Sequence, residues 1–194
     1  MAERLSAAYG LRHYRPDRLE REHAARVDPH RDPAMARWAA RSLDETWVDM
    51  APADLAAETL AYSRERFELI LEDVLDLADE RPVLAEGFQV DPGSLAAVLA
   101  DRRRAVWLIP DEAFRRAVFV RRLGIWDTPR RTSDPERAQR NRLARDAIVA
   151  RELRAAALSH GFRVLDVTTT PLEQVARAVE RQFAPFLPAR RSTR

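Results

Sequence analysis

Short apolar segments alternate along the chain with longer stretches in which apolar residues recur at helical spacing. The apolar segments are partly β-branched and are typical of strands. Ala105–Ile109 is apolar at every position, as expected for a strand that is covered on both faces. We predict four strands: Leu11–Tyr14, Pro82–Ala85, Ala105–Ile109 and Arg163–Val167.

Three helices have recognisable starts. One begins at Pro52 and places Leu60, Phe67, Leu71, Val74 and Ala78 on one stripe. A second begins at Pro135, directly after Ser133 and Asp134, and ends at Gly161. The last begins in the capping box Thr170-Pro171-Leu172-Glu173. Its apolar positions repeat at helical spacing: Leu172, Val175, Ala176, Val179, Phe183 and Phe186.

Alternation of strands and helices predicts an α/β fold with a mostly parallel sheet and helices on both faces. We expect a single domain over residues 1–187 and a frayed tail over 188–194. Ligands of such sheets bind beyond the carboxyl ends of the strands. Asp17 and Glu86, which follow the first two strands, are therefore candidate functional residues.

Composition narrows the possible functions. The 194 residues include no cysteine, so a disulfide framework and a thiolate metal site are excluded. No apolar run is long enough to span a membrane, and we expect a cytoplasmic protein. All 33 basic residues are arginine, and the net charge is only +2, so nucleic-acid binding is not indicated. Guanidinium groups favour planar, bidentate binding of phosphate.

In their order along the chain, these features resemble the P-loop small-molecule kinases, the nucleoside- and nucleotide-kinase-like proteins of AAA family ATPase type. The matching segments are Leu11–Asp17, Val83–Gly87 and Arg104–Pro110, followed by a helix that carries Phe114 and ends at Arg122. The resemblance implies a three-layer fold, Mg²⁺ and ATP as cofactors, and phosphoryl transfer to a small hydroxylated or nucleotide-like acceptor. It also implies a helical acceptor-binding insert over about 18–51 and an arginine-rich lid over about 121–145.

The glycine-rich loop of that family, with its lysine, is absent from this sequence. Met1–Gly10 resembles the helix that follows the loop, so the resemblance implies that the first, central strand is missing. That strand would lie between the strands that end at Glu86 and Ile109, which must then close up or leave two unpaired edges. We expect the native protein to start upstream of Met1, the alternative being a short form. As written, we expect the chain to be inactive.

For the two carboxylates the resemblance implies catalytic roles. Asp17 would accept the proton of the acceptor hydroxyl, or else it caps a helix. Glu86 would serve as base or as a Mg²⁺ ligand, possibly through water, or else it accepts hydrogen bonds from backbone amides near Gly87. Gln89, and more weakly Asp91, would line the same cleft.

Ten arginines lie between Arg115 and Arg145. The resemblance implies that Arg122, Arg130 and Arg131 belong to the lid and contact phosphate. For Arg137, Arg140 and Arg142 we expect a solvated helix face instead.

Trp38, in the insert, could stack on a substrate ring, although a place in the core is favoured. The four histidines have no spacing that indicates a metal site.

Two functions remain open at this point. The first is an ATP-dependent phosphotransferase of the kind just described. The second is a non-catalytic, degenerate kinase-like protein that binds an anionic ligand or partner through its arginine-rich segment.

Overall fold

The computed structural model describes residues 1–77, 81–122, 129–168 and 172–190, with the side chains of 119–122 and 172 excepted. All four predicted strands are present in it. They are β1 (Arg12–Tyr14), β2 (Val83–Ala85), β3 (Val106–Pro110) and β4 (Arg163–Val167). Each lies within one residue of its predicted bounds, because short apolar segments next to prolines and glycines leave little freedom in where a strand can begin or end.

The strands form two separate parallel pairs. β1 pairs with β2 in the register Arg12↔Val83, and β3 pairs with β4 in the register Val106↔Arg163. β2 and β3 are not hydrogen-bonded to each other, so the described residues contain two small sheets and no continuous one. The α/β class with parallel strands is therefore confirmed. The strands that end at Glu86 and Ile109 were expected either to close up or to leave two unpaired edges. They have not closed up.

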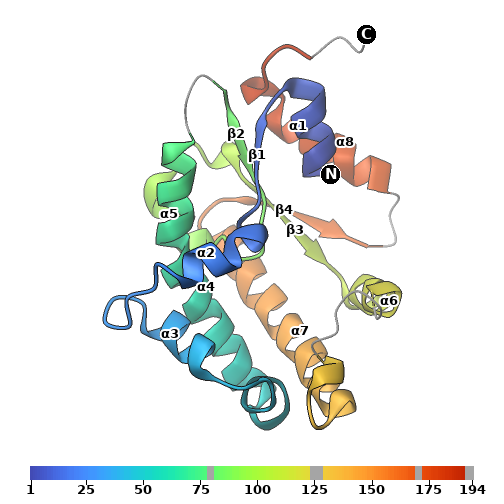
Figure 1. Cartoon of the computed structure of the whole chain (residues 1–194). Coiled ribbons are helices and arrows are strands. Elements are labelled where there is room, and N and C mark those ends of the chain that lie inside the picture. The colour runs from blue at the N-terminus through green and yellow to red at the C-terminus, as the bar shows by residue number, and fades with distance from the viewer. Residues whose placement is uncertain (78–80, 123–128, 169–171, 191–194) are drawn as a thin grey trace.

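Helices surround the strands (Figure 1). In this view α1 (Ala2–Tyr9) and α8 (Leu172–Phe183) lie to the right of β1 and β2 and above β3 and β4, and α4 (Pro52–Asp76) and α7 (Pro135–Ser159) lie below the strands. α6 (Glu112–Arg122) follows β3, and the 3₁₀ turn η5 (Ala184–Phe186) follows α8. The segment over 18–51 contains α2 (Glu20–Ala24), α3 (Pro33–Ala40) and the π-helical turn η2 (Glu45–Asp49).

The starts and ends of α7 agree with the sequence. The Asp134 carboxylate accepts a hydrogen bond from the Arg137 amide at 2.9 Å, and Gly161 has φ +75°, the left-handed conformation that glycine adopts without strain. The capping box predicted for α8 falls largely on residues 169–171, which lie outside the described residues. The helix itself is present, and it buries Val175 and Val179.

One helix was not predicted. α5 (Pro92–Val98) begins at Asp91, whose carboxylate accepts hydrogen bonds from the Ser94 amide at 2.8 Å and the Ser94 hydroxyl at 3.1 Å. The signal was visible in the sequence, because Asp91-Pro92 is an N-cap followed by proline at the first helical position. Asp91 thus caps this helix, and a place for it in a ligand cleft stays a prediction.

Two apolar clusters form the centre of the molecule. Ala56, Val149 and Leu153 pack between α4 and α7. Trp107, Ala157 and Phe162 pack β3 against α7, with the rings of Trp107 and Phe162 centred 4.6 Å apart. Leu108, the next residue of β3, leaves 37% of its surface exposed although its segment is wholly apolar. The face of β3 that carries Leu108 is thus covered less completely than the sequence predicted.

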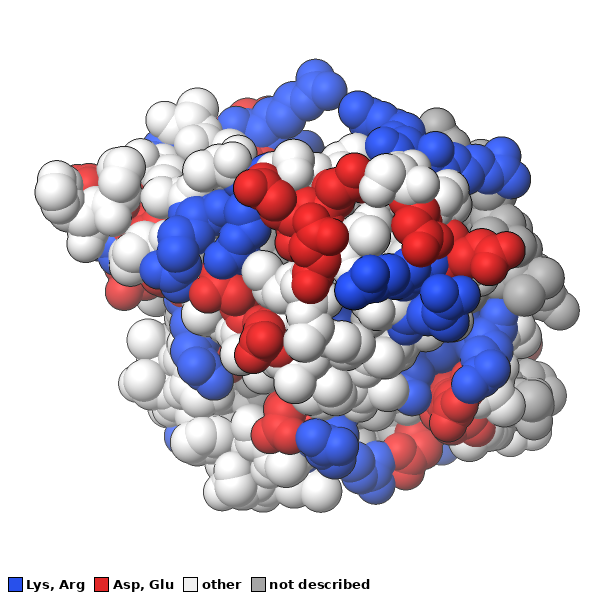
Figure 2. All heavy atoms as spheres, turned by 90° about the horizontal axis from the view of Figure 1, so that it is seen from below, with Lys and Arg blue, Asp and Glu red and all other residues white. Residues whose placement is uncertain are grey.

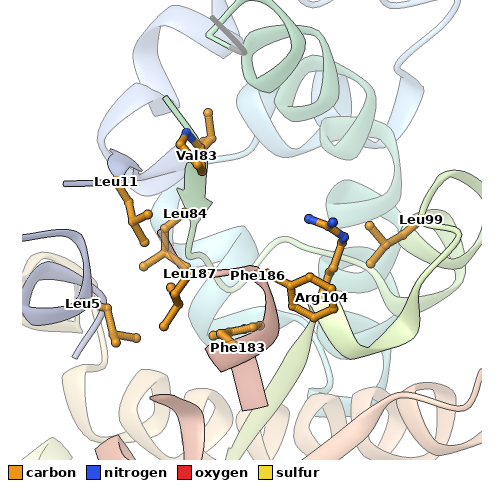
Figure 3. Close-up of a pocket in the computed structure, with 10 residues that line it drawn as sticks. Leu5, Leu11, Val83, Leu84, Leu99, Arg104, Phe183, Phe186 and Leu187 are labelled. Atoms are coloured by element: carbon orange, nitrogen blue, oxygen red, sulfur yellow. The ribbon is translucent and has the colours of Figure 1, made fainter. Parts of the chain in front are cut away.

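An apolar groove of about 270 Å³ lies where β2 approaches the segment before β3. Figure 3 shows Val83 and Leu84 of β2 on one side, Leu99 and Arg104 on another, and Phe183, Phe186 and Leu187 below. The parallel register points the amide and carbonyl of Val83 and Ala85 away from β1, since Leu84 faces β1. The groove therefore borders a strand edge with no hydrogen-bonded neighbour among the described residues.

Candidate functional site

Asp17 and Glu86 lie at the carboxyl ends of two strands that are paired. β1 leads into the 3₁₀ turn η1 (Pro16–Leu19), which carries Asp17, and Glu86 directly follows β2. The Glu86 amide donates to the Tyr14 carbonyl at 3.1 Å, which continues the ladder up to this point. The structure therefore places both carboxylates at one edge, as the sequence predicted, and no side-chain cap of η1 is formed by Asp17.

Gly87 makes this juxtaposition possible. A β-carbon built at Gly87 would lie 2.5 Å from Cγ of the buried Pro16, far inside normal contact distance. Only a residue without a side chain lets the loop after β2 approach the loop after β1 so closely. The approach brings Gln89 to Asp17, whose carboxylate accepts a hydrogen bond from the Gln89 amide group.

The electrostatic surroundings of the two carboxylates differ. Burial raises the pKa of Asp17, and the charge of Glu86 raises it further, against opposing effects of Arg66 and Gln89. Asp17 is nevertheless exposed to solvent. Glu86 lies 3.0 Å from Nε2 of His13 and 3.5 Å from Nε of Arg15. Glu86 is thus bound to basic groups, whereas Asp17 is not.

A raised carboxyl pKa has a consequence for stability that can be tested. The native state resists ionisation of Asp17, because the pKa of this carboxyl is higher in the native than in the unfolded state. Ionisation of Asp17 therefore lowers the free energy of unfolding as the pH rises from the unfolded pKa through the native pKa. We expect Asp17→Asn to raise the free energy of unfolding at pH 7. Urea unfolding at pH 7 and near pH 3.5 measures this, and the gain should shrink at the lower pH. An unchanged gain at both pH values would contradict the raised pKa.

Behind these loops α4 carries a buried stripe of polar residues. Thr59, Ser63 and Arg66 are 4%, 4% and 0% exposed, at the spacing that puts them on one helix face. The hydroxyls of Thr59 and Ser63 donate to the carbonyls four residues earlier, at 2.7 and 2.9 Å. Arg66 donates through Nη2 to the Pro16 carbonyl at 2.6 Å. The sequence did not predict this polar stripe, because only the apolar positions of α4 were used to place the helix.

Two arginines of the arginine-rich segment are buried on α7. Arg142 and Arg145 are 6% and 7% exposed, and their guanidinium carbons lie 5.6 and 5.1 Å from the ring centre of Trp47. Burial lowers the pKa of Arg142 to about 10 and also lowers that of Arg145, while Asp146 opposes both shifts. The solvated face predicted for Arg142 is therefore wrong. Helical periodicity turns this residue toward α4 and η2, whereas Arg137 and Arg140 are on the exposed side as predicted.

Among the described residues no ion pair joins Arg130 or Arg131 to Asp17 or Glu86, and their role in a lid stays a prediction. Arg130 and Arg131 are exposed in the 3₁₀ turn η4 (Pro129–Arg131). The side chain of Arg122 and the 123–128 segment lie outside the described residues.

Trp38 packs within an aromatic cluster. Its ring centre lies 6.1 Å from that of Trp47 and 5.6 Å from that of Tyr62. These contacts support a place for Trp38 in the core. A role for Trp38 in stacking on a substrate ring stays a prediction.

Charged side chains of both signs are interspersed on the face drawn in Figure 2. No helix among the described residues is both long and apolar enough to cross a lipid bilayer. Groups of three or more acidic, histidine or cysteine side chains that could hold a metal ion are likewise not found in the described ranges.

Comparison with known proteins gives no match to this chain among family models, curated proteins or solved structures. What the site does must therefore be argued from its own geometry.

Proposed function

We propose that this chain is a kinase-like phosphotransferase domain whose described residues form the acceptor side of the reaction. The observation that supports this most directly is the position of Asp17. It lies beside Glu86 and Gln89 at the carboxyl edge of β1 and β2, with a pKa raised by burial. A carboxylate of raised pKa at such an edge is suited to hold the proton of a substrate hydroxyl.

The residues divide the work between them. Asp17 would accept the proton from the acceptor hydroxyl, and the Gln89 amide would orient the Asp17 carboxylate. Glu86, paired with His13 and Arg15, is fixed in place, and its charge raises the proton affinity of Asp17. The catalytic role predicted for Glu86 thus becomes an indirect one in this proposal, with Glu86 as a positioning residue.

The cofactors of the related kinases do not fit these residues. A triphosphate cradle needs successive backbone amides of a glycine-rich loop and a lysine, and this chain has no lysine and only five glycines, none within three residues of another. Glu86, bound to two basic side chains, is a poor ligand for Mg²⁺. The proposal therefore derives no step through ATP or Mg²⁺ and assigns only the acceptor side.

A specific observation favours the second candidate, a non-catalytic protein that binds an anion. Arg145 is 7% exposed, and its Nε has no hydrogen-bond partner among the described residues, although Asp146 lies 3.1 Å away. A buried guanidinium that is not fully hydrogen-bonded is costly, and a bound anion would lower that cost. In this case the arginine-rich segment binds its ligand from the inner face of α7.

Thermal unfolding with added ligands separates the two candidates. The phosphotransferase predicts that the neutral acceptor probes adenosine or ribose stabilise the protein and that Asp17→Asn abolishes this. Glu152→Gln, an exposed substitution on α7, is the matched control. Stabilisation by a ligand at 100 times its Kd amounts to about 2.7 kcal/mol.

The second candidate predicts a different set of results. Inorganic phosphate should stabilise the protein through Arg145, and Mg²⁺-ATP should have no effect. A clear shift with Mg²⁺-ATP would rule out this candidate, and the absence of any Asp17-dependent stabilisation by adenosine or ribose would overturn the first.

A further inference from the structure

Arg66 is a buried charge without a carboxylate partner. Its side chain is 0% exposed, and its Nη1 atom has no hydrogen-bond partner among the described residues. The contacts it does make are to neutral groups: Nη2 to the Pro16 carbonyl at 2.6 Å, Nε to Nδ1 of His23 at 2.9 Å, and the guanidinium to the side chain of Tyr62, whose ring centre lies 5.9 Å from Cζ. An uncompensated buried charge costs several kcal/mol, so a protein that keeps one has a use for it.

Hydrogen bonds behind Arg66 fix its orientation. His23 is itself fully buried, and its Nε2 lies 2.7 Å from the Asp73 carboxylate. Asp73 also accepts hydrogen bonds from Tyr14 at 2.8 Å and from Arg26 at 2.6 Å. A guanidinium can only donate, so Nδ1 of His23 must accept from Arg66 and Nε2 must carry the proton. Neutral His23 thus links the anchored Asp73 to Arg66 in one defined tautomer.

The pKa of Asp73 shows that this hydrogen-bonded group carries a negative charge. Burial acts to raise the pKa of Asp73, but hydrogen bonds from His23, Arg26 and Tyr14 outweigh burial and lower it. Burial and the hydrogen bond to Asp73 raise the pKa of Tyr14, which keeps that phenol a donor. Asp73 therefore stays ionised and holds His23 by a charge-assisted hydrogen bond.

The front of Arg66 adjoins the carboxylate site. The Pro16 carbonyl that it binds belongs to the residue before Asp17, and the charge of Arg66 acts on the Asp17 carboxylate. Oε1 of Gln89, the partner of Asp17, is a second buried atom with no hydrogen-bond partner among the described residues. The residues around Asp17 thus hold one unused donor and one unused acceptor. A ligand that satisfies both carries an oxyanion for the donor and a hydroxyl for the acceptor.

We propose that Arg66, held in place by His23 and Asp73, binds the oxyanion of a small hydroxylated anion whose hydroxyl lies at Asp17 and Gln89. The inference rests on the proposed function, because that hydroxyl is the group on which Asp17 would act. It adds to the neutral probes above a preference for acceptors that already bear a phosphate or a carboxylate. The catalytic carboxylate and the binding guanidinium come from different elements, η1 and α4.

Titration of the full chain tests the ligand class. Ribose 5-phosphate and D-gluconate carry a hydroxyl with a phosphate or a carboxylate, and ribose and inorganic phosphate are the partial controls. We expect at least one of the two hydroxylated anions to bind by calorimetry, and their comparison tells phosphate from carboxylate. Arg66→Met should weaken that binding about 10- to 100-fold, the loss expected for one hydrogen bond to a charged group. No binding of either anion at about 10 mM would overturn the inference.

Arg64→Met is the matched control. Arg64 lies on the same helix, but its side chain is 60% exposed and 3.6 Å from Asp91. Its substitution should leave binding unchanged. Equal losses in both variants would show a general charge effect and would overturn the assignment to Arg66.

Two substitutions of His23 test its positioning role. His23→Asn keeps an acceptor near the Nδ1 position and should retain most of the binding of the anion. His23→Gln keeps a donor near the Nε2 position, loses the acceptor for Arg66, and should bind as weakly as Arg66→Met. Identical binding in both variants, once circular dichroism shows both folded, would overturn the role of His23. In the parent protein, ¹⁵N NMR should show His23 as the Nε2–H tautomer. Detection of the Nδ1–H tautomer or of the imidazolium would also overturn the role of His23.

The same titrations distinguish this inference from the proposed function. If binding of the hydroxylated anion depends on Arg66 but neither adenosine nor ribose stabilises the protein through Asp17, the inference stands and the proposed function fails. If adenosine or ribose binds through Asp17 with no dependence on Arg66, the proposed function stands and the inference fails.

Discussion

Trp107→Ala is expected to lower the free energy of unfolding by about 3–5 kcal/mol, the largest effect of any single substitution proposed for this protein. Trp107 is 9% exposed and packs with Ala157 and Phe162, which are 0% and 3% exposed. Its removal leaves a cavity against α7, and β3 and β4 lose their main contact with that helix. Urea unfolding followed by circular dichroism measures the change.

Leu108→Ala, one residue further along β3, is the matched control. Leu108 points to the opposite face of the strand and is 37% exposed, so its truncation should cost only about 1 kcal/mol. The contrast tests whether one face of β3 is open in solution. Equal losses at the two positions would contradict the exposed face and would indicate that Leu108 is covered.

Gly87→Ala is expected to have the second-largest effect, a loss of about 1–3 kcal/mol. The new β-carbon would lie 2.5 Å from Cγ of Pro16, so the loop after β2 must move away from the loop after β1. Since Glu86 and Gln89 lie in that loop, Asp17 should lose the charge that raises its pKa and the amide that binds it. Carboxyl ¹³C chemical shifts followed with pH report on Asp17, and urea unfolding reports on stability.

Gly93→Ala provides the comparison for Gly87. Gly93 lies in α5, where alanine is favoured over glycine by about 1 kcal/mol, and its nearest atom to a new β-carbon would be Asp91 Oδ2 at 3.1 Å. We expect little change or a small gain in stability. A loss as large as that of Gly87→Ala would mean that the close approach to Pro16 has no special importance.

Local signals in the sequence were sufficient for most elements. Prolines at the first helical position, the Asp134 cap and Gly161 locate α4 and α7, and short apolar segments locate all four strands. These signals act over a few residues, so they are legible without knowledge of the fold. α5 was not predicted although its N-cap is of the same kind, because Asp91 was considered as a cleft residue and not as the start of a helix.

The candidate site was predictable only in part. Placing Asp17 and Glu86 at one edge needed no more than parallel strands, since their carboxyl ends meet at the same side. Arg66 and Asp73 lie seven residues apart on one face of α4, but nothing in the spacing along the chain brings His23 of α2 to them. A polar stripe on a helix face that also carries core residues was the one available signal, at Thr59, Ser63 and Arg66.

By itself the sequence determined where the four strands and the helices α4 and α7 lie, and that Asp17 and Glu86 share one edge, because hydrogen-bonding caps and apolar periodicity are local properties. Only the tertiary structure decided which arginines are buried and which strands pair. Burial of Arg66 and Arg145 depends on how α4 and α7 face each other, and the separation of β2 from β3 depends on which backbone edges meet. Both are set by contacts between segments far apart in the chain, which no local pattern encodes.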